Sequence, residues 1–287
     1  MLDVFQILLY GVVLSSIFAL GAVGISLIFG ILRFAHFAHG DMVTVGAYVA
    51  LAGVAGFGIS VWAALPLALA GTILVALVLD QVVYRPLRRT RPVILFLASV
   101  GVAFILRNVI LAIWGPNNLV YQPGIQLPLR FYDLRIKEDQ IVIVVVTVAL
   151  IGALTLFLRH TKLGKAMRAM SDDPDLARVT GIDTDRVIRW TWALGGGLAA
   201  VAGVFLGLDT RLQPSLGWDV LLGFFASAIL GGIGRPMGAI AGALVIGVAS
   251  EFSTLFVPPI YRSAVAFFLM VIVLIVRPTG IFAEARR

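Results

Sequence analysis

The sequence contains no cysteine and few charged residues. Charged residues make up 13% of its 287 residues, whereas an ordinary soluble domain carries about 25%. The absence of cysteine excludes disulfide bonds, thiolate metal sites and cysteine nucleophiles. Because 60% of the chain is hydrophobic and little of it can face water, lipid must be the solvent for much of its surface.

Most of the chain consists of long runs without charged residues. We predict spans at Val4–Leu32, at Met42–Leu79 (two, because Gly56–Ser60 interrupts the run), Pro92–Trp114, Ile141–Leu158, Trp190–Leu208, Trp218–Leu230, Met237–Phe256 and Ile260–Val276. Trp218–Leu230 is short for a hydrocarbon core of about 30 Å, so it is either a tilted span or a half-helix. The chain is therefore predicted to be an all-α, polytopic membrane protein, a single transmembrane domain over residues 1–287 with roughly eight or nine segments, some short or broken.

The net charge of +7 does not indicate nucleic-acid binding, because the basic residues lie in short loops between apolar runs. They cluster at Arg85–Arg91, at Arg159–Arg168 and at Arg286–Arg287. The positive-inside rule places all three clusters, and with them the C-terminus, in the cytoplasm. If every segment crosses, the N-terminus lies outside.

Residues 159–189 form a polar segment with helix signals of its own. Leu163–Met170 is typical of a short basic amphipathic helix. A second short helix is expected after it, with Asp173 as N-cap, Pro174 at the first helical position and Gly181 as terminator. The segment is either a solvated surface loop or an element that docks on a cytoplasmic partner.

A polar stretch joins the first two spans and holds His36, His39 and Asp41. These three side chains suggest a metal site, but no further His or Cys completes the set, so no metal is expected. Asp41 is instead predicted to cap the span that begins at Met42. We expect the helix starts at Gly40–Asp41 and Gly217–Trp218 to approach a pathway, as half-helix ends do in transporters.

The chain has no ATP site of its own, because the pattern GxxxxGK[ST] does not occur in it. The glycine run at Leu230–Gly238 resembles a phosphate loop only superficially. Ionisable residues within the spans are few: Asp80, Arg107 and Glu251. Arg107 is expected to snorkel to the external surface. No chain of acids suits proton transfer, so the energy for uphill transport is expected to come from elsewhere.

Six motifs together resemble the H-type permease of branched-chain amino acid ABC importers. They are Phe37–Asp41, Tyr84–Arg88, Leu163–Ala169, Gly181–Val187, Leu230–Gly234 and Arg277–Phe282. His36 stands where that family usually has Asn. The family also includes urea and amide permeases.

The resemblance implies a non-enzymatic membrane subunit of the bacterial inner membrane, which moves branched-chain amino acids or related small polar solutes into the cytoplasm. The implied partners are a homologous M-type permease, two ATPase subunits that bind ATP and Mg, and a periplasmic substrate-binding protein. The implied ATPase-coupling residues are Gly164, Ala169, Asp172, Asp173, Pro174, Ala177 and Gly181. The expected pathway residues are Phe37, His39, Gly40, Asp41, Gly231, Gly232 and Gly234.

Two other function classes stay open at this point. One is an ion-coupled secondary carrier or channel for a small polar solute, which needs no ATPase. The other is an intramembrane hydrolase that uses His39 and Asp41 with a nearby serine, although the sequence shows neither a nucleophile elbow nor paired catalytic acids.

Overall fold

The computed structural model describes residues 2–121, 129–131, 134–276 and 280. Within these residues seven helices are long and apolar enough to cross a membrane, and two more are apolar but shorter. The seven are α1 (Leu2–Leu32), α2 (Ala38–Phe57), α3 (Val61–Leu79), α5 (Pro92–Trp114), α6 (Glu138–His160), α9 (Thr184–Asp209) and α11 (Pro236–Phe252). The two shorter ones are α10 (Leu216–Gly231) and α12 (Arg262–Val276). The prediction of an all-α polytopic membrane fold with roughly eight or nine segments is confirmed.

Short elements connect these helices. They are the π-helix η1 (Asp80–Tyr84), α4 (Arg85–Leu87), the antiparallel strands β1 (Leu129–Phe131) and β2 (Leu134–Ile136), α7 (Lys162–Asp172), α8 (Pro174–Val179) and the 3₁₀ turns η2 (Ser253–Leu255) and η3 (Pro259–Tyr261). The π-helical turn ends at Tyr84, two residues before Pro86, which has no backbone N–H to donate. α3, η1 and α4 thus form one continuous apolar segment, Val61–Leu87.

Helices α1 and α9 are mostly buried at the centre of the bundle, whereas most residues of α3, α5 and α6 are not buried. Small residues bring the central helices into backbone contact. A Cβ added at Gly203 of α9 would overlap with the carbonyl oxygen of Val43 on α2. Such close approach is a main source of helix association in lipid, where burial of apolar side chains gives little gain.

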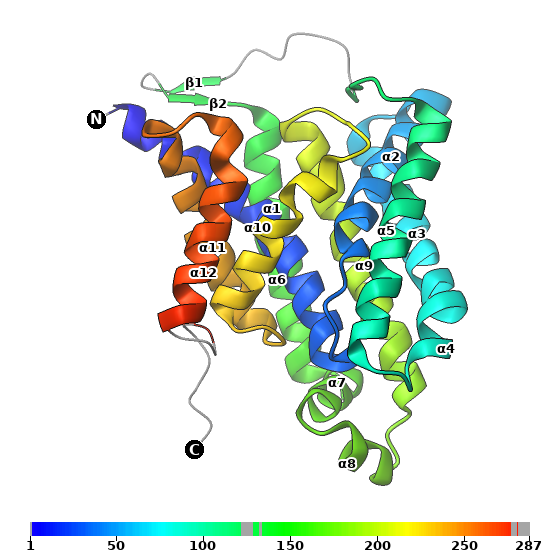
Figure 1. The fold of residues 1–287 in the computed structure, drawn as a ribbon. Helices are drawn as coiled ribbons and strands as arrows, with labels where there is room; N and C mark the ends of the chain where they lie inside the picture. The colour runs from blue at the N-terminus through cyan, green and yellow to red at the C-terminus, as the bar shows by residue number, and fades with distance from the viewer. Residues whose placement is uncertain (1, 122–128, 132–133, 277–279, 281–287) are drawn as a thin grey trace.

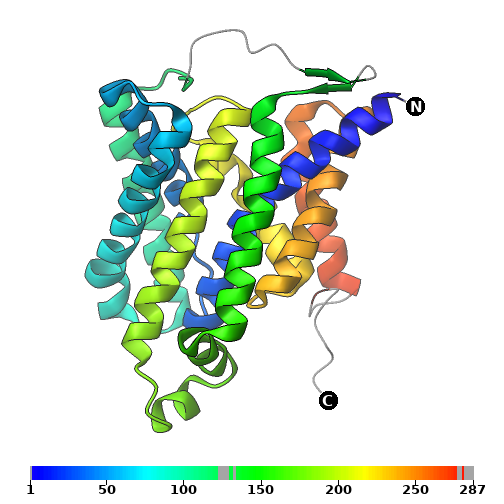
Figure 2. The ribbon, with the colours of Figure 1, turned by 180° about the vertical axis from the view of Figure 1, so that it is seen from behind.

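The two ends of the bundle differ. The start of α1 and the β1–β2 hairpin lie at one end, and α7 and α8 project from the other (Figure 1, and from behind in Figure 2). Arg88, in the basic turn before α5, bonds to Asp185 in the first turn of α9, so this turn shares the α7–α8 end. Both basic internal clusters therefore lie at one end, as the positive-inside rule requires. Arg286–Arg287 and, apart from Gly280, the Arg277–Phe282 motif lie outside the described residues.

Helices α2 and α10 begin inside the bundle. Arg33 has a positive φ of 57° directly after α1, and residues 33–37 run back from the α7–α8 end to the start of α2 (Figure 1). Helix α10 has 16 residues and is about 24 Å long, less than a hydrocarbon core of about 30 Å. These two buried helix starts define the candidate site.

Candidate functional site

Asp41 does not cap a helix, which corrects the sequence prediction. Helix α2 begins at Ala38, four residues before Met42, and places Asp41 in its first turn with a fully buried side chain. Both carboxylate oxygens bond to Arg107 of α5: Oδ1 accepts from Nε at 3.0 Å and Oδ2 from Nη2 at 3.2 Å. Burial of an ionised carboxylate is costly unless a cation bonds to it. The Asp41 carboxylate therefore bonds to Arg107 rather than to the backbone N–H groups at the start of α2.

Arg107 does not snorkel to a surface either. It lies seven residues before the end of α5, about 10 Å along the helix axis, and only 19% of its side chain is exposed. Its guanidinium carbon lies 4.4 Å from the ring centroid of Trp218 in α10, a cation–π contact. The expectation of snorkelling failed because the sequence does not reveal a carboxylate 66 positions away.

The starts of α2 and α10, which the sequence analysis expected to approach a pathway, contact each other. The backbone N–H of Gly217 donates to Oγ1 of Thr44 at 2.9 Å, and a Cβ added at Gly217 would overlap with the carbonyl oxygen of Gly40. Two positive helix-dipole ends therefore meet beside the Arg107–Asp41 pair. That these starts line a pathway remains a prediction.

Aromatic rings surround this junction. The Phe37 ring lies 5.0 Å from Phe96, 5.1 Å from Phe225 and 6.5 Å from Trp218, measured between centroids. These residues come from α5, α10 and the link before α2. The junction thus combines an apolar aromatic wall with one buried ion pair.

His36, in the link before α2, and His39, in the first turn of α2, are both buried. His36 Nε2 lies 3.0 Å from the Tyr84 hydroxyl, and both rings pack on Trp192. Neither ring nitrogen of His39 has a hydrogen-bond partner among the described residues. His39 therefore makes no bond to Asp41 there, and no three His, Asp or Glu side chains gather as a metal-ligand group in the described part of the chain. The hydrolase hypothesis has no catalytic pair in this geometry.

The expected pathway residues fall into two separate groups. Phe37, His39, Gly40 and Asp41 lie at the α2–α10 junction. The other three, Gly231, Gly232 and Gly234, form the turn that ends α10, where Gly232 and Gly234 have φ of 99° and 86°. Since α10 separates the two groups by about 20 Å and Gly234 packs on Gly30 near the end of α1, the structure does not bring them together.

The segment 159–189 has the two short helices that the sequence predicted. Oδ1 of Asp173 accepts from the backbone N–H of Asp175 and of Leu176, each at 3.0 Å, and Pro174 begins α8. Gly181 has the positive φ, 85°, that a helix terminator requires. The predicted cap, start and stop of α8 are confirmed.

The predicted coupling residues differ in their accessibility. Asp172, Asp173 and Gly181 are exposed, and Ala169 and Pro174 are half-buried. Gly164 is buried against the carbonyls of Phe157 and Leu158, and Ala177 is 3% exposed. The exposed apolar residues of α8 are Leu176, 61% exposed, and Val179, 85% exposed, which the sequence analysis did not select. A helical wheel of Pro174–Val179 would have found them only once the buried face was known.

The three ionisable residues that the sequence analysis named inside the spans, Asp80, Arg107 and Glu251, each form an ion pair. Besides Arg107 with Asp41, Arg88 bonds to Asp80 at 2.6 Å and Arg262 to Glu251 at 2.8 Å. The sequence analysis identified one member of each pair and missed Asp41 as the partner of Arg107. Each of the three acids thus has a cationic partner, and loss of one partner from a buried pair would leave an uncompensated charge.

Comparison with known proteins places the chain in a family. Residues 7–274 match the family described as branched-chain amino acid transport system / permease component. The chain is 34% identical to the high-affinity branched-chain amino acid transport system permease protein LivH of Salmonella typhimurium, over 96% of this chain and 94% of that protein. It is 32% identical to the corresponding protein BraD of Pseudomonas aeruginosa, over 97% and 95%.

Among solved structures, PsaBC from Streptococcus pneumoniae in complex with Fab is similar in fold. The TM-score is 0.53 at 14% identity, over 96% of this chain and 92% of that one. The family match over most of the chain and the relatives above 30% identity agree with the six motifs. This chain belongs to the family of permease components of branched-chain amino acid transport systems.

Proposed function

We propose that this chain is the membrane permease subunit of an ATP-driven importer of branched-chain amino acids. The relatives named as branched-chain amino acid permeases support the substrate class. The observation that carries the coupling proposal is α8, which exposes Leu176 and Val179 at the basic end of the bundle. Large apolar side chains that face water on a short helix favour a protein partner.

The division of labour follows from the resemblance to importer permeases. The chain lacks a P-loop, and the resemblance implies that two partner ATPase subunits bind ATP and Mg, so we expect no cofactor in this chain itself. A homologous M-type permease completes the pathway, and a periplasmic binding protein delivers the substrate. The α7–α8 end faces the cytoplasm of a bacterial inner membrane, since the basic turn and α7 share it. The C-terminus is assigned to the same side.

The Arg107–Asp41 pair suits an amino-acid substrate. A zwitterion carries a carboxylate that matches Arg107 and an ammonium that matches Asp41. The rings of Phe37, Trp218 and Phe225 provide apolar contact for a branched side chain. We assign the pathway to this junction, with exchange between the ion pair and the substrate charges. Urea and amides carry no such charges and fit it less well.

The coupling proposal is tested with charged substitutions on the exposed face of α8. Leu176→Asp and Val179→Asp leave the helix cap and the buried Ala177 in place, so the chain still inserts and folds. We expect loss of ATPase subunits on affinity purification and loss of ATP-driven uptake in vesicles that hold the full transporter. Leu176→Met is the matched control, because it keeps the apolar contact.

Ala177 is also one of the predicted coupling residues, but the variant Ala177→Arg would not test docking. Ala177 is 3% exposed and packs against its own chain, so Arg would unseat α8 rather than test docking. Full uptake by Leu176→Asp and Val179→Asp would refute the coupling role of α8. Uptake by the purified chain alone in a proton or sodium gradient would instead establish a secondary carrier.

A further inference from the structure

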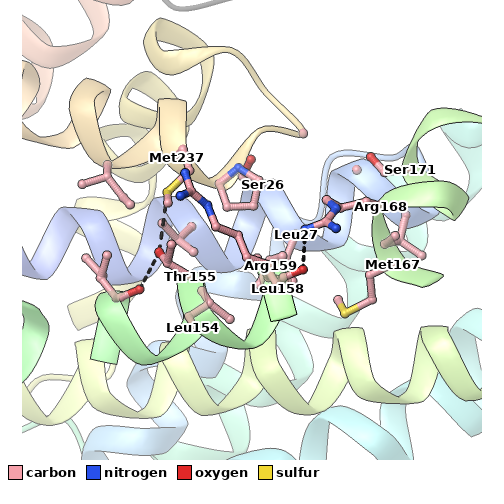
Figure 3. A pocket seen from close by; sticks show the side chains of 17 residues that line it. Ser26, Leu27, Leu154, Thr155, Leu158, Arg159, Met167, Arg168, Ser171 and Met237 are labelled. Atoms are coloured by element: carbon pink, nitrogen blue, oxygen red, sulfur yellow. Dashed lines mark hydrogen bonds between the residues drawn. The ribbon is translucent and has the colours of Figure 1, made fainter. Parts of the chain in front are cut away.

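A second feature lies away from the Arg107–Asp41 junction. A pocket of about 210 Å³ opens between α1, α6, α7 and α11, at the α7–α8 end. Apolar side chains from α1, α6 and α11 form most of its wall, among them Val23, Leu27, Leu154, Met237 and Ile240 (Figure 3). None of the residues at the α2–α10 junction lines it.

The polar groups of the pocket are ordered by depth. Arg159, near the end of α6, and Arg168 of α7 are exposed and lie nearest the α7–α8 end. Ser26 lies six residues before the end of α1, about 9 Å farther in, and Thr155 five residues before the end of α6. Val23 lies almost one more turn inside. From the α7–α8 end inward, the lining of the pocket thus changes from cationic side chains to hydroxyl groups and then to apolar side chains.

One of these hydroxyls lacks a partner. Ser26 is fully buried, and its Oγ makes no hydrogen bond within the described residues. Buried hydroxyls are normally bonded, so an orphan on a pocket wall points to a ligand that supplies an acceptor. Across the pocket, Thr155 donates to the carbonyl of Ile151 at 2.8 Å and retains lone pairs but no second donor.

The charged side chains that line the pocket indicate the type of ligand. Among the described residues that line the pocket, two are cationic and none is acidic. The ammonium of a free amino acid would find no carboxylate here, whereas an anion with an apolar tail finds all its partners. Arg168 donates one N–H to the carbonyl of Leu158 and has further N–H groups available. Figure 3 shows Arg159 extended toward Met237.

We propose that this pocket binds one anionic phospholipid from the leaflet on the α7–α8 side. The phosphate lies between Arg159 and Arg168, an ester oxygen accepts from Ser26, and one acyl chain runs along Val23, Leu27 and Ile240. Ser171 of α7 also lines the pocket, and its carbonyl accepts from Arg33 at the end of α1. In this position the lipid contacts α1, α6 and α7 together.

The test uses the complete transporter, purified from membranes and reconstituted in nanodiscs of phosphatidylcholine with or without phosphatidylglycerol. Native mass spectrometry measures the phosphatidylglycerol that stays bound. Arg159→Gln removes one phosphate contact, and Ile240→Phe narrows the acyl groove but keeps both arginines. Arg89→Gln is the matched control, because Arg89 is an equally exposed arginine at the same end that does not line the pocket.

We expect Arg159→Gln to weaken retention about tenfold, since one charge-assisted contact is lost. Ile240→Phe should also weaken it, and Arg89→Gln should behave like the unmodified protein. Equal retention in Arg159→Gln and the unmodified protein would overturn the proposal. So would an equal loss in all three variants, which would indicate general surface attraction. A photo-crosslinker at Met237 that captures a neighbouring subunit rather than lipid would also overturn it.

Discussion

Removal of Arg107 is the most direct test of the buried ion pair. In Arg107→Gln the Asp41 carboxylate keeps its place, with none of its side chain exposed, but loses its cation. Loss of one partner from a buried pair costs about 3–5 kcal/mol, because the remaining charge is uncompensated. The Gln amide still donates one hydrogen bond, so we expect the lower end, about 3 kcal/mol.

Two further variants separate charge burial from other effects. The double variant Asp41→Asn, Arg107→Gln removes both charges, so most of the lost stability should return. Arg262→Gln breaks a pair of similar length, 2.8 Å, in which the arginine is 41% exposed. Water then compensates more of the lost contact, and we expect a smaller effect than for Arg107→Gln.

Stability is measured as the unfolding of the purified chain in mixed micelles over an SDS titration, and function as ATP-driven uptake by the reconstituted transporter. The order expected for stability is unmodified protein, double variant, Arg262→Gln, then Arg107→Gln. The double variant should stay poor in uptake, since a neutral pair cannot exchange with a zwitterion. An Arg107→Gln chain as stable as the unmodified one would refute the energetic argument, and full uptake by the double variant would refute substrate recognition.

Three further outcomes are expected. Thr44→Val leaves the backbone N–H of Gly217 without its acceptor and should destabilise the chain by about 1–3 kcal/mol in the same SDS titration, whereas Thr44→Ser should be close to neutral. Gly203→Val forces α9 away from Val43 of α2, so the chain should insert but fail to assemble with its partners on purification, and normal assembly would contradict the close packing. Asp173→Ala removes the cap of α8 at a cost of about 1 kcal/mol, seen as faster amide hydrogen exchange in α8 with exchange in α7 unchanged.

Local patterns explain why so much of the fold was predictable. A helix satisfies its backbone hydrogen bonds within one segment, and about 20 apolar residues suffice for one to cross the bilayer, so uncharged runs such as Val4–Leu32 gave spans close to the observed bounds. The start and stop of α8 depend on contacts within a few residues of Asp173 and Gly181, which the sequence displays directly. The six motifs likewise led to the family that the comparisons show.

The site was less predictable, because its contacts join distant segments. The sequence by itself determined that the chain is a helical membrane protein, where most spans lie and how α8 is capped. Only the tertiary structure decided that Asp41 pairs with Arg107 rather than capping α2, that α2 and α10 begin against each other, and that α8 buries Ala177 while exposing Leu176. The physical reason is that helix formation and capping depend on neighbours in sequence, whereas the partner of a buried charge and the buried face of a short helix depend on which helices pack together.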